Sequence, residues 1–336
     1  IGLVGSEMCI RDRPIMRITA TFLDEISFDI PHHNWGRDEW DRDFAAMKAM
    51  GIRRVVLIRC ASGYFTAYPS EVIPRRGVKH RPPIDLVDLF LELSEKHGFE
   101  FFAGTWHCNP GNCIDWSREQ YLDEIRINLD VIDELQARYG HRKAFAGWYL
   151  THEVCSNEPG TIELFQTLGS HAKKVSGNKP TLISPYFAGV KAAAATCDPN
   201  ALRLTPELHA EHWGRIFRDI AGAVDITAFQ DGHVDYPELA EYLTVTRELA
   251  DANHIRCWSN IESFDRDMPW RFPPIKWEKF LWKLESAEAA GISEGITFEF
   301  SHFMSPNSMY PAAGALFDRY CEYCGLTARS RDLRGS

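Results

Sequence analysis

The stretch Phe145–Glu153, read Phe-Ala-Gly-Trp-Tyr-Leu-Thr-His-Glu, decides the fold that we predict, because an apolar run stops there on a carboxylate. A short apolar run with polar residues after it is typical of a buried parallel strand. The segment Arg256–Glu262, read Arg-Cys-Trp-Ser-Asn-Ile-Glu, repeats this pattern and also ends on a glutamate. Two strands are therefore predicted to point carboxylates toward one place.

Short strand-like runs alternate eight times with helix-like stretches. The predicted strands are Ile18–Leu23, Arg54–Ile58, Phe99–Gly104, Phe145–Leu150, Thr181–Ser184, Asp225–Phe229, Arg256–Ile261 and Gly295–Phe300. One predicted helix follows a capping box of Ser117 and Gln120 and has a buried face at spacings of three and four, formed by Leu122, Ile125, Leu129 and Ile132. The other predicted helices are Arg37–Met50, Ile84–His97, Ile162–Val175, Pro206–Ile220 with Thr205 as its N-cap, Leu239–Asn253, Trp277–Ala290 and Ala312–Tyr323.

The two kinds of connection differ in length and composition. Helix-to-strand turns are short and carry a helix-ending residue, namely Gly51, Gly98, Gly140, Gly177, Gly222, Asn253 and Gly291. Strand-to-helix connections such as Cys60–Pro83 and Pro185–Leu204 are longer and rich in aromatic and polar residues. This asymmetry predicts an α/β fold, a single (β/α)8 TIM barrel with its functional loops at one end. The alternative, a doubly wound open sheet, normally has a glycine-rich turn after its first strand, where this chain reads Leu-Asp-Glu-Ile-Ser.

The two ends of the chain are set apart from the predicted barrel. Residues 3–13 resemble a translated sequencing adapter, so we treat residues 1–15 as a non-native scar and Met16 as a plausible start. Residues 16–324 form the predicted barrel, with no internal repeat or linker. Residues 325–336 are polar and basic and are predicted to be disordered.

Composition excludes several classes of function. The pI is near 5.7 and the sequence has no basic cluster, so we expect no nucleic-acid partner. The sequence also has no run of about 18 apolar residues, so we expect no membrane span. The eight cysteines outside the scar are scattered, which favours free thiols and a cytoplasmic location over disulfides. An export signal lost upstream of the scar is the alternative. Ten tryptophans suit either a large core or stacking platforms for sugar rings.

Catalytic groups of a barrel sit where the strands end, so the polar residues at those positions are a short set of candidates. Alternation along the strands puts Tyr149 with Glu153, and Trp258 with Glu262, on one face each. Two facing carboxylates are what hydrolysis of a glycosidic bond needs, one to protonate the leaving oxygen and one to act as nucleophile or base. The full set is Asp24, Glu25, Arg59, Trp106, His107, Thr151, His152, Glu153, Tyr186, Gln230, Asp231, Asn260, Glu262, Glu299 and His302.

Carboxylates that end the fourth and seventh strands resemble the acid/base and nucleophile of the clan of retaining (β/α)8 glycoside hydrolases. Longer motifs are similar to the bacterial domain-of-unknown-function 4434 family, a glycoside-hydrolase-like barrel. They are Phe22-Leu-Asp-Glu-Ile-Ser with Asn34-Trp-Gly, Gly147-Trp-Tyr-Leu with His152-Glu153, Ala228-Phe-Gln-Asp-Gly232 and Phe298-Glu-Phe-Ser-His-Phe-Met-Ser-Pro-Asn-Ser308. His152 stands where the clan usually has asparagine before the acid/base, so the clan's contact to the sugar 2-hydroxyl is not implied here.

The resemblance implies a carbohydrate substrate, with Glu153 as general acid/base and Glu262 as nucleophile. We expect an apolar setting and a second carboxylate to raise the pKa of Glu153. No cofactor or metal is expected. The predicted substrate-binding residues are Glu25, Trp35, Arg59, Trp106, His107, His152, Tyr186, Gln230, Asp231, Asn260, Trp270, Glu299 and His302.

Other roles for these residues stay open at this point. Glu153 and Glu262 could instead form buried salt bridges with Arg59 or another strand-end arginine. A divalent-metal enzyme is a second alternative, with hard ligands among Glu153, Asp231, His233, Glu262, Glu299 and His302, although no tight metal-binding spacing is present. A barrel that binds sugar without cleaving it is the third. Cys321-x-x-Cys324 lacks a second pair and is interpreted as two thiols.

Overall fold

The computed structural model describes residues 15–27, 30–63, 65–73, 84–108, 117–156, 158–192, 202–268 and 272–335. The adapter-like residues through 14 and the predicted sugar platform Trp270 lie outside these ranges.

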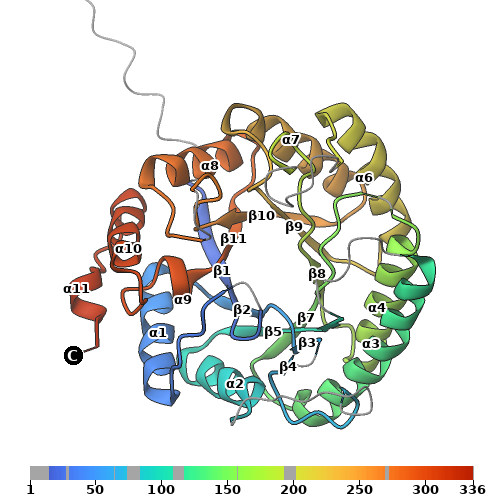
Figure 1. The fold of residues 1–336 in the computed structure, drawn as a ribbon, viewed down its shortest axis with the longest axis horizontal. Helices are drawn as coiled ribbons and strands as arrows, with labels where there is room; N and C mark the ends of the chain where they lie inside the picture. The colour runs from blue at the N-terminus through green and yellow to red at the C-terminus, as the bar shows by residue number, and fades with distance from the viewer. Residues whose placement is uncertain are drawn as a thin grey trace, which may run out of the picture.

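Eight strands close into a barrel in which each neighbouring pair is parallel, which confirms the predicted (β/α)8 TIM barrel (Figure 1). The order around the barrel is β1-β11-β10-β9-β8-β7-β5-β2. The pairing of β1 with β11, with Thr21 opposite Thr297, closes the ring. The strands are β1 (Arg17–Leu23), β2 (Arg54–Leu57), β5 (Glu100–Gly104), β7 (Phe145–Leu150), β8 (Thr181–Ile183), β9 (Ile226–Gln230), β10 (Arg256–Glu262) and β11 (Glu294–Phe298).

Helices form a ring around the strands (Figure 1). Their ends follow the local signals in the sequence: Ser117 and Gln120 form the predicted capping box of α3, and the Thr205 side chain caps α6. Gly51 and Gly98 end α1 and α2 in the left-handed conformation, which glycine adopts without strain. The helices of the ring are α1 (Arg37–Met50), α2 (Leu86–His97), α3 (Arg118–Tyr139), α4 (Thr161–Val175), α6 (Pro206–Ile220), α7 (Tyr236–Ala252), α8 (Trp277–Ala289) and α10 (Pro311–Tyr323).

The interior of the barrel is filled by side chains, so it is a core and not a pore. Tyr149 and Trp258 belong to this interior cluster, which confirms the faces that alternation predicted for β7 and β10. A ligand therefore has access only at an end of the barrel. The cluster consists of Ala20, Phe22, Val56, Ile58, Phe102, Tyr149, Leu182, Ile226, Ala228, Trp258 and Ile296. We call the end where the strands reach their carboxyl ends the mouth.

Three short strands in the loops at the mouth were not predicted. The strands β3 (Ala61–Ser62), β4 (Phe65–Thr66) and β6 (Trp106–His107) form a small sheet, in which β3 pairs with both of the others. Two-residue strands leave no periodicity in a sequence, and β3 meets β6 only because the loops after β2 and β5 are brought together by the barrel. The small sheet holds Trp106 and His107 near the end of β2.

The predicted last strand extended to Phe300, but β11 ends at Phe298 and the helix α9 (Phe300–Phe303) follows. The Glu299 side chain causes this change, since it accepts hydrogen bonds from the backbone N–H groups of Ser301 and His302. Such a side-chain cap stops strand pairing and starts a helical turn.

The C-terminal tail, predicted to be disordered, is described through residue 335 and packs against the barrel. It contains the short helix α11 (Ser330–Leu333). The Ser330 backbone N–H and hydroxyl donate to the Asp318 carboxylate at 2.6 and 2.8 Å, and the Gly335 N–H donates to Asn307 at 3.0 Å. These contacts depend on α10 and the loop before it, which the polar composition of the tail does not reveal.

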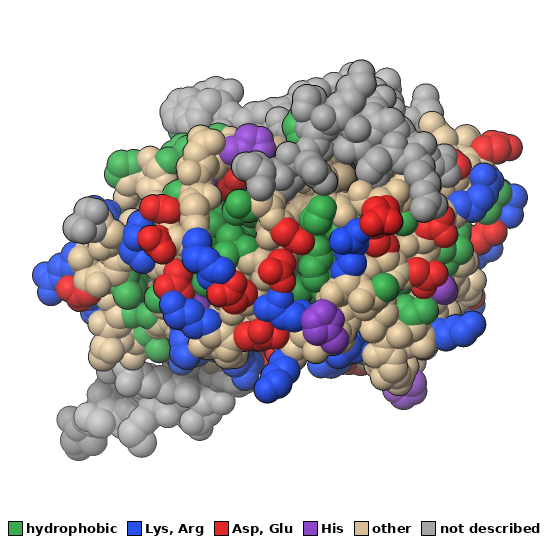
Figure 2. Space-filling view, turned by 90° about the horizontal axis from the view of Figure 1, so that it is seen from below, with side chains coloured by type: hydrophobic (Ala, Val, Ile, Leu, Met, Phe, Trp, Pro, Cys, Tyr) green, Lys and Arg blue, Asp and Glu red, His purple; other side chains and the backbone are tan. Residues whose placement is uncertain are grey.

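Acidic and basic side chains are intermingled on the face of the molecule in Figure 2. Among the described residues, no helix has both the length and the apolar character needed to cross a membrane.

Candidate active site at the barrel mouth

Both predicted catalytic glutamates lie at the carboxyl ends of strands. Glu262 is the last residue of β10, and Glu153 follows the last residue of β7 by three positions. Because the barrel strands are parallel, these ends meet at the mouth. The two carboxylates differ in exposure, since Glu262 is 1% exposed whereas the Glu153 side chain is 35% exposed.

Glu262 is held by an arginine four residues further along the chain. The Nε and Nη2 atoms of Arg266 donate to its two carboxylate oxygens at 2.7 and 2.6 Å. Such a bidentate pair is among the strongest polar contacts in proteins. Burial alone raises the pKa of Glu262, but the charge and hydrogen bonds of Arg266 outweigh burial and the pKa is lowered. Glu262 is therefore ionised at neutral pH.

A second buried ion pair adjoins Glu262. Lys283 Nζ lies 2.6 Å from Asp231 Oδ1 and 3.1 Å from the backbone oxygen of Glu262. Asp231 Oδ1 also accepts the backbone N–H of Glu262 at 3.2 Å, whereas Oδ2 has no hydrogen-bond partner among the described residues. Burial raises the pKa of Asp231 to about 6, although Lys283 opposes it. Asp231 thus acts on Glu262 through the backbone.

Glu153 lies in a more polar setting than we expected for a general acid. Its Oε1 is 3.8 Å from Nη2 of Arg59, which is only 4% exposed. The salt bridge to Arg59 considered from the sequence is therefore formed, loosely. For Glu262 the partner is Arg266 instead, an arginine of the following loop.

One guanidinium interacts electrostatically with both glutamates. Burial lowers the pKa of Arg266, but Glu262, Glu153 and Asp231 each raise it, and the net change is upward. The charges of Glu153 and Glu262 therefore both act on the pKa of Arg266.

Gly232 makes room for this ion pair. A Cβ added at Gly232 would overlap Oε2 of Glu262 and Nε of Arg266. Any larger residue would have to displace one of the two charged groups. The glycine after Asp231 is therefore required by close approach and not by backbone conformation.

Three predicted substrate-binding residues gather around Ser184, just past the end of β8. Gln230 Nε2 donates to the Ser184 backbone oxygen at 3.0 Å, and Asn260 Nδ2 donates to its hydroxyl at 3.0 Å. Tyr186 bridges to Gln230 through the backbone. The other polar atom of Asn260, Oδ1, is buried without a hydrogen-bond partner among the described residues. The β8–β10 side of the mouth thus presents unused hydrogen-bonding capacity.

On the β5–β7 side, the predicted residues Trp106, His107 and His152 are all buried. The two imidazole rings lie 5.0 Å apart, and His152 Nε2 is 3.3 Å from Oε2 of Glu124 on α3. Burial, followed by the charges of His152 and Arg59, lowers the pKa of His107 well below its ordinary value. The His107 ring is therefore neutral at neutral pH.

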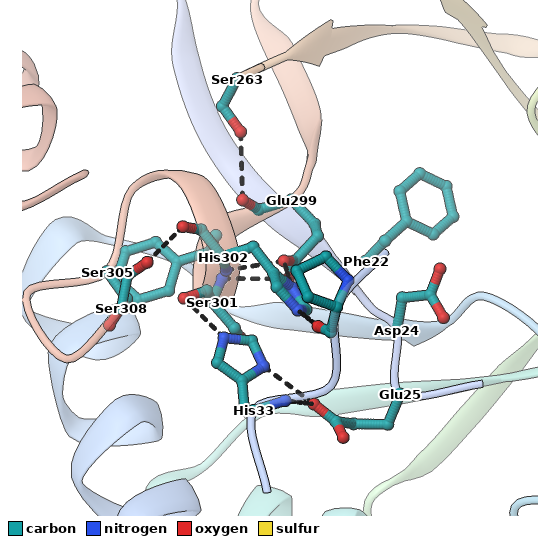
Figure 3. A network of polar contacts seen from close by, with 12 residues as sticks. Phe22, Asp24, Glu25, His33, Ser263, Glu299, Ser301, His302, Ser305 and Ser308 are labelled. Carbon is teal, nitrogen blue, oxygen red and sulfur yellow. Dashed lines mark hydrogen bonds and ion pairs between the residues drawn. The ribbon is translucent and has the colours of Figure 1, made fainter. Parts of the chain in front are cut away.

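On the β1–β11 side, Glu299 and His302 form a closed network (Figure 3). Glu299 accepts the N–H groups of Ser301 at 3.0 Å and His302 at 2.7 Å and forms an ion pair with the His302 ring, whose Nε2 is 2.7 Å from the Pro31 carbonyl oxygen. Burial lowers the pKa of His302, but the ion pair raises it to about 9. Both side chains are 0% exposed. We predicted that they contact substrate; their burial favours a positioning role.

Glu25 and His33 extend this network toward the surface. His33 Nδ1 lies 2.8 Å from Glu25 Oε1, and its ring lies tilted against the His302 ring with 3.6 Å between centroids. The Trp35 ring also lies tilted against His33, at 3.9 Å between centroids, and makes an edge-to-face contact with Trp40 at 5.0 Å. Trp35, predicted as a platform for sugar, thus already packs against protein rings, and only Glu25 of this group retains a partly exposed carboxylate.

Two groups of described residues bring potential metal ligands together: Glu25, His33 and His302, and His107, Cys108 and Glu124. In the first group, each ring nitrogen of the two histidines faces an acceptor oxygen, so N–H bonds occupy the positions that a metal would need. Neither group contains Glu153 or Glu262. Within the described ranges, the metal site considered from the sequence is therefore not assembled around the paired glutamates.

Sequence reasoning missed Arg266, Lys283, Gly232 and Asp43. Asp43 lies on α1, and its buried carboxylate accepts the hydroxyls of Ser301, at 2.8 Å, and Ser305. Burial raises the pKa of Asp43 to about 6. The spacing of four between Glu262 and Arg266 was a usable signal. The long-range contacts of the other three residues leave no local pattern.

The pattern that defines the family described as "Domain of unknown function (DUF4434)" matches residues 18–310. The chain belongs to this DUF4434 family. A solved protein of Bacteroides thetaiotaomicron VPI-5482, provisionally assigned as an alpha-L-fucosidase, is 43% identical to the DUF4434 chain. The similarity covers 97% of this chain and 98% of that one, with a TM-score of 0.86. No curated protein matches the DUF4434 chain.

More distant solved structures share the barrel with the DUF4434 chain. An endo-1,4-beta-D-mannanase of Thermotoga petrophila RKU-1 is 12% identical, covers 85% of this chain and 88% of that one, and has a TM-score of 0.53. A beta-galactosidase of Marinomonas ef1 is 12% identical, covers 95% and 61%, and has a TM-score of 0.56. At such identities the similarity establishes the fold alone, a glycosidase-like barrel.

Proposed function

We propose that this protein hydrolyses a glycosidic bond, with Glu153 as general acid/base and Glu262 as nucleophile. The observation that carries the proposal is the unequal setting of two carboxylates at the strand ends. Glu262 is buried and fixed by two hydrogen bonds from Arg266, whereas the Glu153 side chain is 35% exposed and lies 3.8 Å from Arg59. Different settings for two carboxylates are what the two roles in this reaction require.

Glu262 has the properties of the nucleophile. A nucleophilic carboxylate must be ionised and must point at one atom of the substrate, and the bidentate contact with Arg266 supports both requirements. The backbone N–H of Glu262 is also held by Asp231, which in turn is fixed by Lys283. The summed charge of these four groups is close to zero, so the buried carboxylate is compensated.

Glu153 has the properties of the acid/base. A partly exposed carboxyl group at the mouth can reach the leaving oxygen of a bound sugar and later a water molecule. A substrate that covers Glu153 excludes water from it, and loss of water raises the pKa of a carboxyl group. Arg59 acts in the opposite direction, so the proposal requires that substrate binding loosens the 3.8 Å contact between the two residues.

The surroundings of the pair suit a carbohydrate. We propose that Arg59, Trp106, His107, His152, Tyr186, Gln230, Asp231 and Asn260 bind or orient the sugar. Asp231 and Asn260 each bury an oxygen that has no hydrogen-bond partner among the described residues, and sugar hydroxyls can supply such partners. For Glu299 and His302 we propose an indirect role, in holding the loops after β1 and β11.

The test is a screen of aryl glycosides and oligosaccharides, with and without EDTA, on the wild type and on Glu153→Gln and Glu262→Gln. Glu163→Gln is the matched control, since Glu163 lies outside the mouth on α4 and pairs with Arg118. We expect Glu262→Gln to lower kcat by about 1,000-fold or more on every substrate. Glu153→Gln should lose about 100- to 10,000-fold on oligosaccharides but much less on aryl glycosides, whose leaving groups need no acid.

Three results would contradict the proposal. Near-normal turnover in either glutamine variant would remove that residue from its role. Loss of activity in EDTA would favour a metal enzyme. Binding of sugars without turnover of any substrate would favour a non-catalytic carbohydrate-binding barrel.

A further inference from the structure

His233 is a buried polar residue that the proposed mechanism does not yet use. It lies in the loop after β9 and is 6% exposed, with the ring edge of Tyr186 against it at 5.0 Å between centroids. The preceding residue, Gly232, lies against the Glu262–Arg266 pair. The backbone oxygen of His233 accepts the N–H of Lys191 at 3.0 Å, which fixes the loop. The ring is therefore held beside the proposed nucleophile.

Both ring nitrogens of His233 lack a hydrogen-bond partner among the described residues. The Phe187 backbone lies close enough to the ring to raise the pKa of His233, but it does not form a hydrogen bond of good geometry with either ring nitrogen. Two other buried histidines differ: His302 meets an acceptor at each ring nitrogen, and the core residue His209 bonds Thr246 through Nε2 at 2.9 Å. A buried polar group without a partner reduces stability unless something else bonds it. The two ring nitrogens of His233 that make no hydrogen bond among the described residues therefore point to a ligand.

The charge state of His233 limits what that ligand can be. Burial and then the charge of Arg266 lower the pKa of His233 to about 3, so the ring is neutral at neutral pH. A neutral imidazole has one N–H donor and one bare nitrogen acceptor. A hydroxyl group both donates and accepts, and so it can bond either nitrogen. A carboxylate can use only the donor and would also be repelled by Glu262.

We propose that His233 binds a hydroxyl group of a neutral sugar unit placed against Glu262, and so helps to select neutral sugars over uronic acids. The proposal rests on the proposed function for the identity of the ligand. It deepens that function by assigning a specificity-determining residue. A polar site of this kind rejects an analogue that lacks the hydroxyl, because the buried imidazole then loses its partner.

The first experiment observes the ring directly and does not need turnover. The protein is labelled with 15N-histidine, and long-range 1H–15N spectra report which ring nitrogen of each histidine carries a proton. The His233→Phe variant identifies the His233 signals. We then add D-glucose, D-galactose, D-mannose, D-xylose, L-fucose and, as the charged comparison, D-glucuronate. At least one neutral sugar is expected to shift the His233 signals while those of the core residue His209 stay in place.

The second experiment uses the substrate found in the glycoside screen. His233→Phe should lower kcat/KM by about 10- to 100-fold, and His233→Gln, which keeps a donor and an acceptor, should recover part of the loss. Deoxy analogues of the substrate complete a cycle. The analogue that lacks the bound hydroxyl should lose a similar factor with the wild type and little more with His233→Phe.

The outcomes separate this inference from the proposed function. If glycosides are cleaved but His233→Phe keeps full kcat/KM and the His233 signals do not move, the inference is wrong and the function stands. If a neutral sugar shifts the His233 signals but nothing is cleaved, the inference stands and the hydrolase proposal fails. Equal shifts with glucuronate, or no shift with any sugar and no cleavage, overturn the inference as well.

Discussion

The two sides of the barrel mouth carry similar residues but bond them differently. On the β1–β11 side, Glu299 and His302 are fully buried, and each of their polar atoms is bonded within the protein (Figure 3). On the β8–β10 side, Asp231, His233 and Asn260 are also buried, yet each has at least one polar atom without a hydrogen-bond partner in the described part of the chain. Buried polar residues on the two sides of the mouth therefore differ in whether the protein itself satisfies their hydrogen bonds.

The difference indicates which side is built for a ligand. We call a network saturated when all of its polar atoms are hydrogen-bonded within the protein; such a network has no donor or acceptor left for a ligand and serves to fix the backbone. A network with unbonded polar atoms, which we call unsaturated, is stabilised when a ligand forms hydrogen bonds with those atoms. Asp24, which follows β1, is an exception on the saturated side: Oδ1 accepts the N–H groups of Ile26 and Ser27, whereas Oδ2 has no hydrogen-bond partner among the described residues.

The largest effect is expected on the saturated side, from Glu299→Gln. Removing one charge of a buried ion pair leaves the other uncompensated, and we expect a loss of about 3 to 5 kcal/mol in the free energy of unfolding, measured with urea at pH 7. Turnover below the unfolding transition should change little. The double variant Glu299→Gln/His302→Gln is the control, because it should lose less than the sum of the single variants.

The same variant tests the charge of His302. A histidine whose folded-state pKa is about 9 contributes stability that is fully present below pH 6.5, its ordinary pKa, and is lost as pH rises through 9. The wild type should therefore lose stability between pH 6.5 and 9, and Glu299→Gln should lose much less. Identical slopes for the two proteins would show that His302 is not held as a cation.

The next largest effect is expected on the unsaturated side, from Gly232→Ala. The added Cβ would overlap the Glu262–Arg266 pair, so we expect kcat/KM on the substrate of the wild type to fall by about 100-fold, or about 2.7 kcal/mol. Gly214→Ala on α6 is the matched control, because its Cβ would only touch Leu249 at 3.4 Å. Equal activities of the two alanine variants would argue against a catalytic Glu262.

The smallest effect over any one pH unit is expected from Asp43→Asn, which tests how the saturated network responds to acid. Burial raises the pKa of Asp43 from 3.8 to about 6, so the folded state binds the proton more tightly than the unfolded state. Because of Asp43, the free energy of unfolding should fall as pH rises from about 4 to 6, with a slope of at most about 1.4 kcal/mol per pH unit. Unfolding in urea across this range should show a shallower decline for Asp43→Asn. An unchanged slope would contradict a raised pKa.

Much of the fold could be predicted because its signals are local. The apolar run of β7 and the cap at Thr205 each lie within a few residues, and both were located correctly. The strands β3 and β6 could not be found, because each has two residues and exists only where two loops meet. The early end of β11 depends on the Glu299 side chain, which accepts hydrogen bonds from the backbone N–H groups of Ser301 and His302.

The sequence could predict the end of the barrel at which the candidate site lies, but not the contacts that its side chains make. The rule that barrel strands end at one mouth predicted Glu153, Glu262 and Asp231 at that end without coordinates, and Asp231 does bond the backbone of Glu262. It could not tell that the Trp35 ring packs against both His33 and Trp40, or that Lys283 reaches Asp231 from α8. Long side chains can turn in many directions, and the packing of neighbouring helices decides which one they take.

The ion pair between Glu262 and Arg266 has a consequence for protein engineering. Both charges lie within five consecutive residues of the sequence. A loop from another protein can therefore replace the segment after Arg266 without separating the Glu262 carboxylate from its counter-ion. A graft that begins directly after Glu262 would leave a buried anion alone. Chimeras within the family should therefore place the junction on the far side of the arginine.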